Sequence, residues 1–211
     1  MIKHEYIKCM DTKELILEKT LKLMIEKQNS LVSVREISDA TGIATGGIYH
    51  YFSNKKQIYD EIIERYAINY VKFDIDKLRQ IRGNAKEKIH NAMVEIFKQK
   101  QNGIKIETIE DKIDYRIILI ILTPNIYSYE NSMEFYQGVL KELEDFFAEI
   151  VEEGQKNSEI RQDLSTEDIV ESLIIMYTGI QYKWEEYLID DMIKSFEDNF
   201  DLEWEKIKFR E

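Results

Sequence analysis

The chain has 211 residues, of which 44% are hydrophobic and 33% are charged, a composition that favours a globular protein over a disordered one. Its one cysteine, Cys9, excludes an internal disulfide and a thiolate metal site. The first residues lack the apolar core of a signal peptide, and the longest apolar run, residues 117–122, is too short to span a bilayer. We therefore expect a cytoplasmic protein.

The net charge of -12 is unevenly distributed along the chain. Residues 1–70 contain 10 basic and 10 acidic residues, whereas the remainder contains 19 and 31. Affinity for a polyanion depends on the local field, so the acidic remainder does not exclude a DNA-binding N-terminal segment. It does predict weak non-specific binding to DNA.

The residue content predicts an all-α protein of about nine helices. One proline and eight glycines leave few residues that interrupt helices, and no stretch alternates convincingly as a strand would. A first helix is expected at residues 11–28, where residues at three- and four-residue spacing share one face. These residues are Leu17, Thr20, Leu21 and Met24.

Residues 33–52 have the pattern of a helix-turn-helix. Ser33 and Glu36 are spaced as a capping box, and Gly42 supplies a turn residue that tolerates positive φ. The apolar residues expected to pack the two helices are Val34, Ile37, Ala40, Ile43, Ile48 and Phe52. On the second of these helices the residues left on the solvent side are small or polar, as a helix needs in order to enter the DNA major groove, which is about 12 Å wide. They are Thr45, Gly46, Gly47, Tyr49 and His50. A plain helical hairpin with a glycine turn remains an alternative at this point.

The rest of the chain is expected to form a helical bundle. Asn54 and Gln57 repeat the capping pattern, and the fourth helix is predicted to run from Lys55 to about Arg82. Two domains follow from this: residues 1–70, with the fourth helix linking to about 82, and residues 83–211. Further helices are predicted at residues 85–101, 111–122, 132–154, 166–184 and 190–208, with a break at Pro124.

Three segments, Ser33–Ser38, Thr41–Ile43 and Gly46–Ile58, together resemble the DNA-binding signature of the TetR/AcrR family of bacterial transcriptional regulators. The match spans about residues 14–66. Residues 157–164 are similar to the family's loop before its eighth helix. The resemblance implies a homodimer with an N-terminal DNA-binding head and a helical body that binds an effector and dimerises. Such a protein usually represses a promoter from a palindromic operator and leaves the DNA when a small molecule binds.

Carried over by position, the resemblance implies DNA contacts at Ser33, Arg35, Thr45, Gly47, Tyr49, His50 and Lys55, with Gly46 on the same surface. Lys55 matches the family's phosphate-contacting lysine. At Ala44, Thr45 and Gly47 the family usually has serine, lysine and threonine, so this helix lacks a cap, a charge and a hydroxyl group. Our hypothesis is that Gly46 and Gly47 let the backbone approach DNA, while Tyr49, His50 and DNA shape set the sequence preference.

Aromatic residues fall on the helices that enclose the effector pocket of the resembled family. Each alone is more often core than ligand contact, but together they suit an aromatic or cationic compound. They are Phe97, Tyr115, Tyr127, Tyr129, Phe135, Tyr136, Tyr177 and Trp184. The last two helices carry apolar stripes that predict a dimer interface, with an internal core stripe as the alternative. These stripes comprise Ile169, Leu173, Met176, Ile180, Met192, Phe196 and Phe200.

Enzyme and metal chemistry find little support in the sequence. His4, His50 and His90 lie far apart, and no phosphate-binding glycine loop, nucleophile elbow or metalloprotease motif is present. We expect no cofactor, no metal and no catalysis. The alternative function is a helical regulator on the same scaffold whose body binds a protein partner instead of a small molecule.

Overall fold

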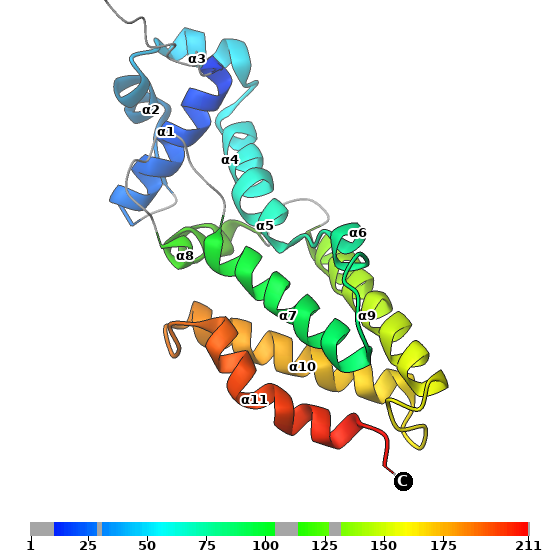
Figure 1. Cartoon of the computed structure of the whole chain (residues 1–211). Helices are drawn as coiled ribbons and strands as arrows, with labels where there is room; N and C mark the ends of the chain where they lie inside the picture. The colour runs from blue at the N-terminus through cyan, green and yellow to red at the C-terminus, as the bar shows by residue number, and fades with distance from the viewer. Residues whose placement is uncertain (1–10, 29–30, 104–113, 127–131, 211) are drawn as a thin grey trace, which may run out of the picture. The chain divides into compact units, whose positions relative to one another are not determined.

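The computed structural model describes residues 11–28, 31–103, 114–126 and 132–210 (Figure 1). Within these residues the chain is helical, with one isolated β-bridge between Ile160 and Lys208 and no strand, which confirms the all-α class. The described residues form two compact units. Residues 11–69 and 114–126 belong to an N-terminal unit, and residues 70–103 and 132–210 to a C-terminal unit.

The N-terminal unit is built around α1, which packs against α2, α4 and α8. The α1 residues predicted to share a face are buried, as are Ile48 and Phe52 from the helix-turn-helix. The elements of this unit are α1 (Thr12–Glu26), α2 (Val34–Thr41), α3 (Thr45–Tyr51), α4 (Lys55–Ile63), the π-helix η1 (Glu64–Ile68) and α8 (Tyr115–Ile126). A short helix, α5 (Asn69–Val71), continues η1.

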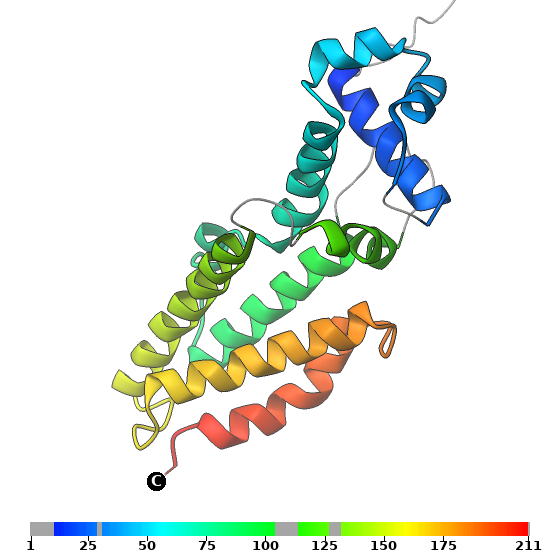
Figure 2. The same ribbon diagram turned by 180° about the vertical axis from the view of Figure 1, so that it is seen from behind.

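In the C-terminal unit, four long helices surround one core (Figures 1 and 2). Helix α7 packs against α9 and α11, and α10 packs against the same two helices. Phe97, Phe147, Leu173 and Phe196 are fully buried between them. The elements are α6 (Ile75–Leu78), α7 (Ala85–Asn102), α9 (Ser132–Lys156), α10 (Thr166–Glu185) and α11 (Met192–Ile207). If α4, η1 and α5 are taken as one helix and the single-turn α6 is set aside, the described residues contain nine helices.

Two helices depart from the sequence prediction. The predicted helix from Lys55 to Arg82 is wrong, because α4 passes into the π-helix η1, α5 ends at Val71, and residues 72–74 are not helical. The predicted break at Pro124 is also wrong, because α8 continues to Ile126. Pro124 lies in the last turn of α8, so its effect on the helix is confined to the end, and α8 stops two residues later.

The end of α5 is explained by a mutual contact with Lys100, which is fully buried near the end of α7. The Lys100 ammonium donates to the Tyr70 carbonyl at 2.5 Å, and the Tyr70 hydroxyl donates to the Lys100 carbonyl at 3.1 Å. The same ammonium lies 4.8 Å from the ring centroid of Tyr70 and 4.5 Å from that of Phe73. We call these contacts the Tyr70–Lys100 clamp. They hold residues 70–73 against α7.

Burial determines the electrostatics of the clamp. Removal of the ammonium from water lowers the pKa of Lys100 to about 7, and the negative charge of Glu185 opposes that change. Contacts with a carbonyl and two aromatic rings offset part of the desolvation, and no described carboxylate is in direct contact with the ammonium. The clamp is therefore only partly charged near neutral pH.

Gly154 of α9 lies where α7 and the loop after α9 leave no room for a side chain. A Cβ atom built on Gly154 would lie 2.8 Å from Ala85 Cβ and 2.8 Å from Ile160 Cδ1. We expect Gly154→Ala to lower the free energy of unfolding by about 1–3 kcal/mol, because helix and loop must move apart. Urea unfolding followed by circular dichroism measures this change.

Gly138 provides the control on the same helix. A Cβ atom there would meet nothing within 4 Å, so Gly138→Ala should be neutral or stabilising by up to about 1 kcal/mol, since alanine favours helix. Equal destabilisation by both substitutions would contradict the packing role of Gly154.

Candidate functional site

The turn between α2 and α3 is held by glycine geometry and two side-chain hydrogen bonds. Gly42 follows α2 with φ 72° and ψ 7°, the left-handed conformation that the sequence predicted for it. The Ser38 hydroxyl donates to the Ile43 carbonyl at 2.7 Å, and the Thr41 hydroxyl donates to the Ile37 carbonyl at 2.7 Å. The orientation of α3 against α2 is thus fixed by contacts within the turn itself.

The start of α2 is capped as predicted. Ser33 Oγ accepts from the Glu36 amide at 3.3 Å, and the Glu36 carboxylate accepts from the Ser33 amide at 2.8 Å. Lys27 also pairs with Glu36, and its hydrogen bond, followed by those from Ser33, lowers the pKa of Glu36 to about 2. Glu36 is therefore ionised at neutral pH but has a cationic partner, and the neighbouring Arg35 is exposed.

The start of α4 is capped differently from the prediction. The Asn54 side chain accepts from the Gln57 amide at 3.0 Å, as a capping box requires. However, Gln57 Oε1 accepts from the amide of Ser53, not from that of Asn54, at 2.7 Å. Tyr59, one turn further along α4, exchanges two 2.8 Å hydrogen bonds with the amide and carbonyl of Val32. The first turn of α4 and the chain entering α2 are thus held together.

Helix α3 presents the surface that the sequence predicted. Thr45, Gly46, Tyr49 and His50 are exposed, and the His50 ring meets Tyr51 edge-on with centroids 5.3 Å apart. Ala44 provides no side-chain cap for this helix, in agreement with the sequence. One correction concerns Ala40, which is exposed and does not join the packing between α2 and α3.

The two glycines of α3 differ in their surroundings. A Cβ atom on Gly47 would lie 2.8 Å from Ile43 Cγ2, so any larger residue there would require the Ile43 side chain to shift. A Cβ atom on Gly46 would meet nothing within 4 Å. The hypothesis that glycine permits close approach to DNA stays a prediction for both residues, and Gly47 in addition packs closely against Ile43.

The charge around α3 is positive but small. Residues 40–59 contain no Asp or Glu. Lys56 is paired with Asp60 at 2.7 Å, whereas Lys55 lies over the Tyr59 ring at 5.1 Å and pairs with no carboxylate among the described residues. Lys55 and Arg35 are therefore the side chains of this surface most available to an anionic partner.

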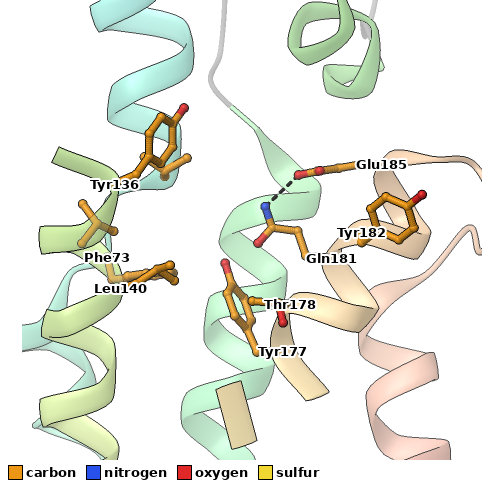
Figure 3. A pocket seen from close by; sticks show the side chains of 10 residues that line it. Phe73, Tyr136, Leu140, Tyr177, Thr178, Gln181, Tyr182 and Glu185 are labelled. Carbon is orange, nitrogen blue, oxygen red and sulfur yellow. Dashed lines mark hydrogen bonds between the residues drawn. The ribbon is translucent and has the colours of Figure 1, made fainter. Parts of the chain in front are cut away.

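The C-terminal unit contains a cavity of about 230 Å³ (Figure 3). Figure 3 shows Phe73, Tyr136 and Leu140 on one side and residues of α10 on the other. In α10, Gln181 donates to the Glu185 carboxylate at 2.7 Å. The lining residues are Val71, Phe73, Tyr136, Val139, Leu140, Tyr177, Thr178, Gln181, Tyr182 and Glu185. We call this cavity the body pocket.

Two of the predicted effector residues, Tyr136 and Tyr177, line the body pocket. Phe97 stacks on Tyr177 with ring centroids 5.7 Å apart, which places it in the wall behind the lining. Phe135 meets Tyr136 edge-on at 6.0 Å and does not line the cavity. These contacts make Phe97 and Phe135 supporting residues, which corrects their predicted role as ligand contacts.

The remaining predicted effector residues lie elsewhere. Tyr115 belongs to the N-terminal unit, where its hydroxyl donates to the Tyr66 carbonyl of η1. Trp184 is buried and does not line the body pocket. Tyr127 and Tyr129 fall outside the described residues. Of the helices that carry the predicted aromatic residues, α9 and α10 contribute to the lining and α7 and α8 do not, because side-chain direction separates lining from core.

Sequence reasoning missed most of the lining. Phe73 and Val71 were missed because the fourth helix was predicted to continue through them. On α10, the available signal was the spacing of Gln181 and Glu185, four and eight residues after Tyr177, since such residues share one helix face. The other missed residues are Val139, Leu140, Thr178 and Tyr182.

The predicted dimer residues are mostly interior. Six of them pack the core of the protomer and offer a partner little surface, so the internal core stripe is the correct interpretation for these positions. They are Ile169, Leu173, Ile180, Met192, Phe196 and Phe200. Met176 is partly exposed and borders a second cavity, of about 240 Å³, between α10 and α11.

Exposed apolar residues form part of the wall of that second cavity, beside polar and charged side chains. Ile175 is 60% exposed and Leu202 is 65% exposed, and both line it together with Met176 and Gly179. Glu203 is nearly buried there and accepts hydrogen bonds from Ser172 and Lys206. We call the surface formed by Ile175, Met176, Gly179 and Leu202 the α10–α11 face.

In the described part of the chain, no three His, Cys, Asp or Glu side chains gather in a way that would hold a metal ion. None of the described helices is long and apolar enough to cross a membrane.

Comparisons with known proteins agree with this arrangement. Residues 16–62 match the model of the bacterial regulatory proteins of the tetR family. The HTH-type transcriptional repressor KstR2 of Mycolicibacterium smegmatis is 23% identical over 155 residues, which are 72% of this chain and 68% of the relative.

Two solved structures share the fold over nearly the whole chain. The ketosteroid transcriptional regulator KstR2 of Mycobacterium tuberculosis superposes with a TM-score of 0.60 at 12% identity, covering 96% of this chain and 98% of that one. A TetR transcription regulator from Haloarcula marismortui gives 0.62 at 13% identity, covering 94% and 98%. With the helix-turn-helix, these findings show that residues 16–62 carry the DNA-binding domain of the tetR family of bacterial regulatory proteins, and that the chain shares the fold of TetR transcription regulators.

Proposed function

We propose that the protein is a cytoplasmic repressor that binds a palindromic operator as a homodimer and leaves it when a small molecule occupies the body pocket. The observation that carries this proposal is α3 itself. Its exposed Thr45, Gly46, Tyr49 and His50 form a helix end without acidic side chains, on a turn held by internal hydrogen bonds. Such a helix suits insertion into the major groove.

Different side chains of this surface have different roles. Tyr49 and His50 carry hydrogen-bonding groups on exposed rings and are proposed to read base edges. Arg35, Lys55 and the capped N-terminus of α2 at Ser33 are proposed to contact phosphates, which position the protein without reading sequence. Thr45 and Gly47 complete the proposed contact surface. Because α3 has few base-reading groups, phosphate contacts and dimer geometry must supply much of the affinity.

The α10–α11 face is proposed to hold the second copy of the chain. Exposed Ile175 and Leu202 would each gain from burial, and Gly179, with open space where a Cβ would lie, allows another helix to approach closely. A two-fold dimer would present its heads to half-sites separated by about 34–36 Å or a multiple of it.

Release of DNA is proposed to begin at Val71 and Phe73. Both line the body pocket. Val71 is the last residue of the continuous run of α4, η1 and α5 that begins just after α3, and Phe73 follows that run. A ligand that displaces these side chains acts on residues 70–73, whose position the Tyr70–Lys100 clamp fixes. A cavity of about 230 Å³ with aromatic walls favours a small molecule over the alternative of a protein partner.

The proposal is tested by gel shift and fluorescence anisotropy with DNA from upstream of the protein's own coding sequence. We expect specific binding that weakens with salt. His50→Ala should remove discrimination of about 1–3 kcal/mol at one base pair of each half-site. Lys55→Gln should weaken binding to all sequences and reduce the salt slope by about 1 per head.

Lys56→Gln is the matched control for Lys55, because Lys56 is already paired with Asp60. Its effect on the salt slope should be clearly smaller. If the wild-type protein binds upstream and unrelated DNA equally, or if the two lysine variants behave alike, the assignment of this surface is incorrect.

The dimer is tested by sedimentation of Ile175→Glu. A carboxylate on each copy would replace apolar burial at the α10–α11 face with the cost of removing a charge from water, so we expect a shift from dimer to monomer and weaker operator binding. Ile120→Glu is the control, since Ile120 is 58% exposed on α8 in the other unit, close to the 60% of Ile175. A dimer that survives Ile175→Glu would place the interface elsewhere.

A further inference from the structure

The lining of the body pocket combines aromatic rings with one acidic group. Phe73, Tyr136, Tyr177 and Tyr182 supply the rings, and Glu185 supplies a carboxylate. None of the ten described residues that line it is basic. Aromatic faces carry partial negative charge, so rings and carboxylate together create a site of negative potential.

Glu185 lacks a cationic partner in direct contact among the described residues. Its carboxylate accepts a hydrogen bond from Gln181 at 2.7 Å. Burial raises the pKa of Glu185, which reflects the free energy needed to hold its charge away from water. A cation placed beside this carboxylate would offset that free energy.

Lys100 balances the charge of Glu185 only in part. Its ammonium is turned to the Tyr70 carbonyl and to the rings of Tyr70 and Phe73, and it forms no ion pair with Glu185. Its pKa of about 7 means that near neutral pH many molecules lack this charge altogether. The contact with Phe73 also shows that an aromatic side chain of the lining already accommodates an ammonium group.

We propose that the body pocket binds a small organic cation with an apolar body, whose positive charge lies beside Glu185 and against the surrounding rings. This inference rests on the proposed effector-binding role of the pocket. The volume of about 230 Å³ lies below the roughly 300–1,000 Å³ of pockets for drug-sized ligands, so it suits a compound built on one ring. A ligand carboxylate would meet Glu185 without a basic lining residue to receive it.

The test compares the binding of benzyltrimethylammonium with that of its neutral carbon isostere, neopentylbenzene. Binding is measured by calorimetry and by the fluorescence of Trp184, which directly precedes Glu185 in the chain. For the wild-type protein we expect the cation to bind about tenfold more tightly or better. Glu185→Gln, which keeps an amide partner for Gln181, should abolish that preference. Glu186→Gln is the matched control, because Glu186 is the exposed neighbour and does not line the pocket.

A second variant tests the balance with Lys100. Lys100→Met keeps a long apolar side chain in the buried position and removes the internal positive charge near Glu185. We expect benzyltrimethylammonium to bind this variant more tightly than the wild type. Equal or weaker binding in a folded Lys100→Met protein would count against the inference.

Operator binding measured in parallel separates the possible failures. If neopentylbenzene binds as tightly as the cation, or if Glu185→Gln binds the cation unchanged, the cation inference is overturned while a ligand-binding pocket remains. If a neutral compound alone binds and releases operator DNA, the proposed function stands and the inference does not. If neither probe binds while DNA binding is intact, the inference is overturned and the effector role of the pocket loses its support.

Discussion

The hydrogen bonds exchanged by Tyr70 and Lys100 hold the stretch of chain on which the proposed regulation depends. This stretch begins where α5 follows η1, and it supplies Val71 and Phe73 to the body pocket. An uninterrupted helix from Lys55 to Arg82 would carry these side chains on helical spacing instead. Because the ammonium of Lys100 needs a carbonyl and aromatic rings when buried, the clamp and the local break in the helix are two aspects of one constraint.

In the N-terminal unit, contacts between residues close in sequence are sufficient to position the helix-turn-helix. Gly42, the Ser33 cap and the hydroxyl of Ser38 fix α2 and α3 within a few residues of sequence. Gly47 then allows α3 to pack on Ile43, leaving the opposite face to solvent. A rigidly placed helix with few charged groups is consistent with the proposed DNA recognition, which relies on phosphate contacts, DNA shape and the symmetry of a dimer.

This contrast explains what sequence reasoning could predict. Caps, turns and helix faces depend on near neighbours, so the helix-turn-helix and the boundaries of α7 and α10 were predicted within one or two residues. The body pocket depends on Phe73, Tyr136 and Glu185, which come from distant segments whose relative rotation no local pattern specifies. The dimer stripe was misread for the same reason, because apolar spacing does not tell core from interface.

The most direct test of the account is the linkage between ligand and operator. Operator affinity is measured with and without saturating benzyltrimethylammonium, in the wild type and in Tyr70→Phe, which loses the hydroxyl bond to the Lys100 carbonyl. The account predicts that the ligand weakens operator binding of the wild type by about 5- to 150-fold. In Tyr70→Phe the ligand should weaken operator binding by a clearly smaller factor, although the ligand and the operator each still bind the variant on their own. An equal factor in both proteins would contradict it.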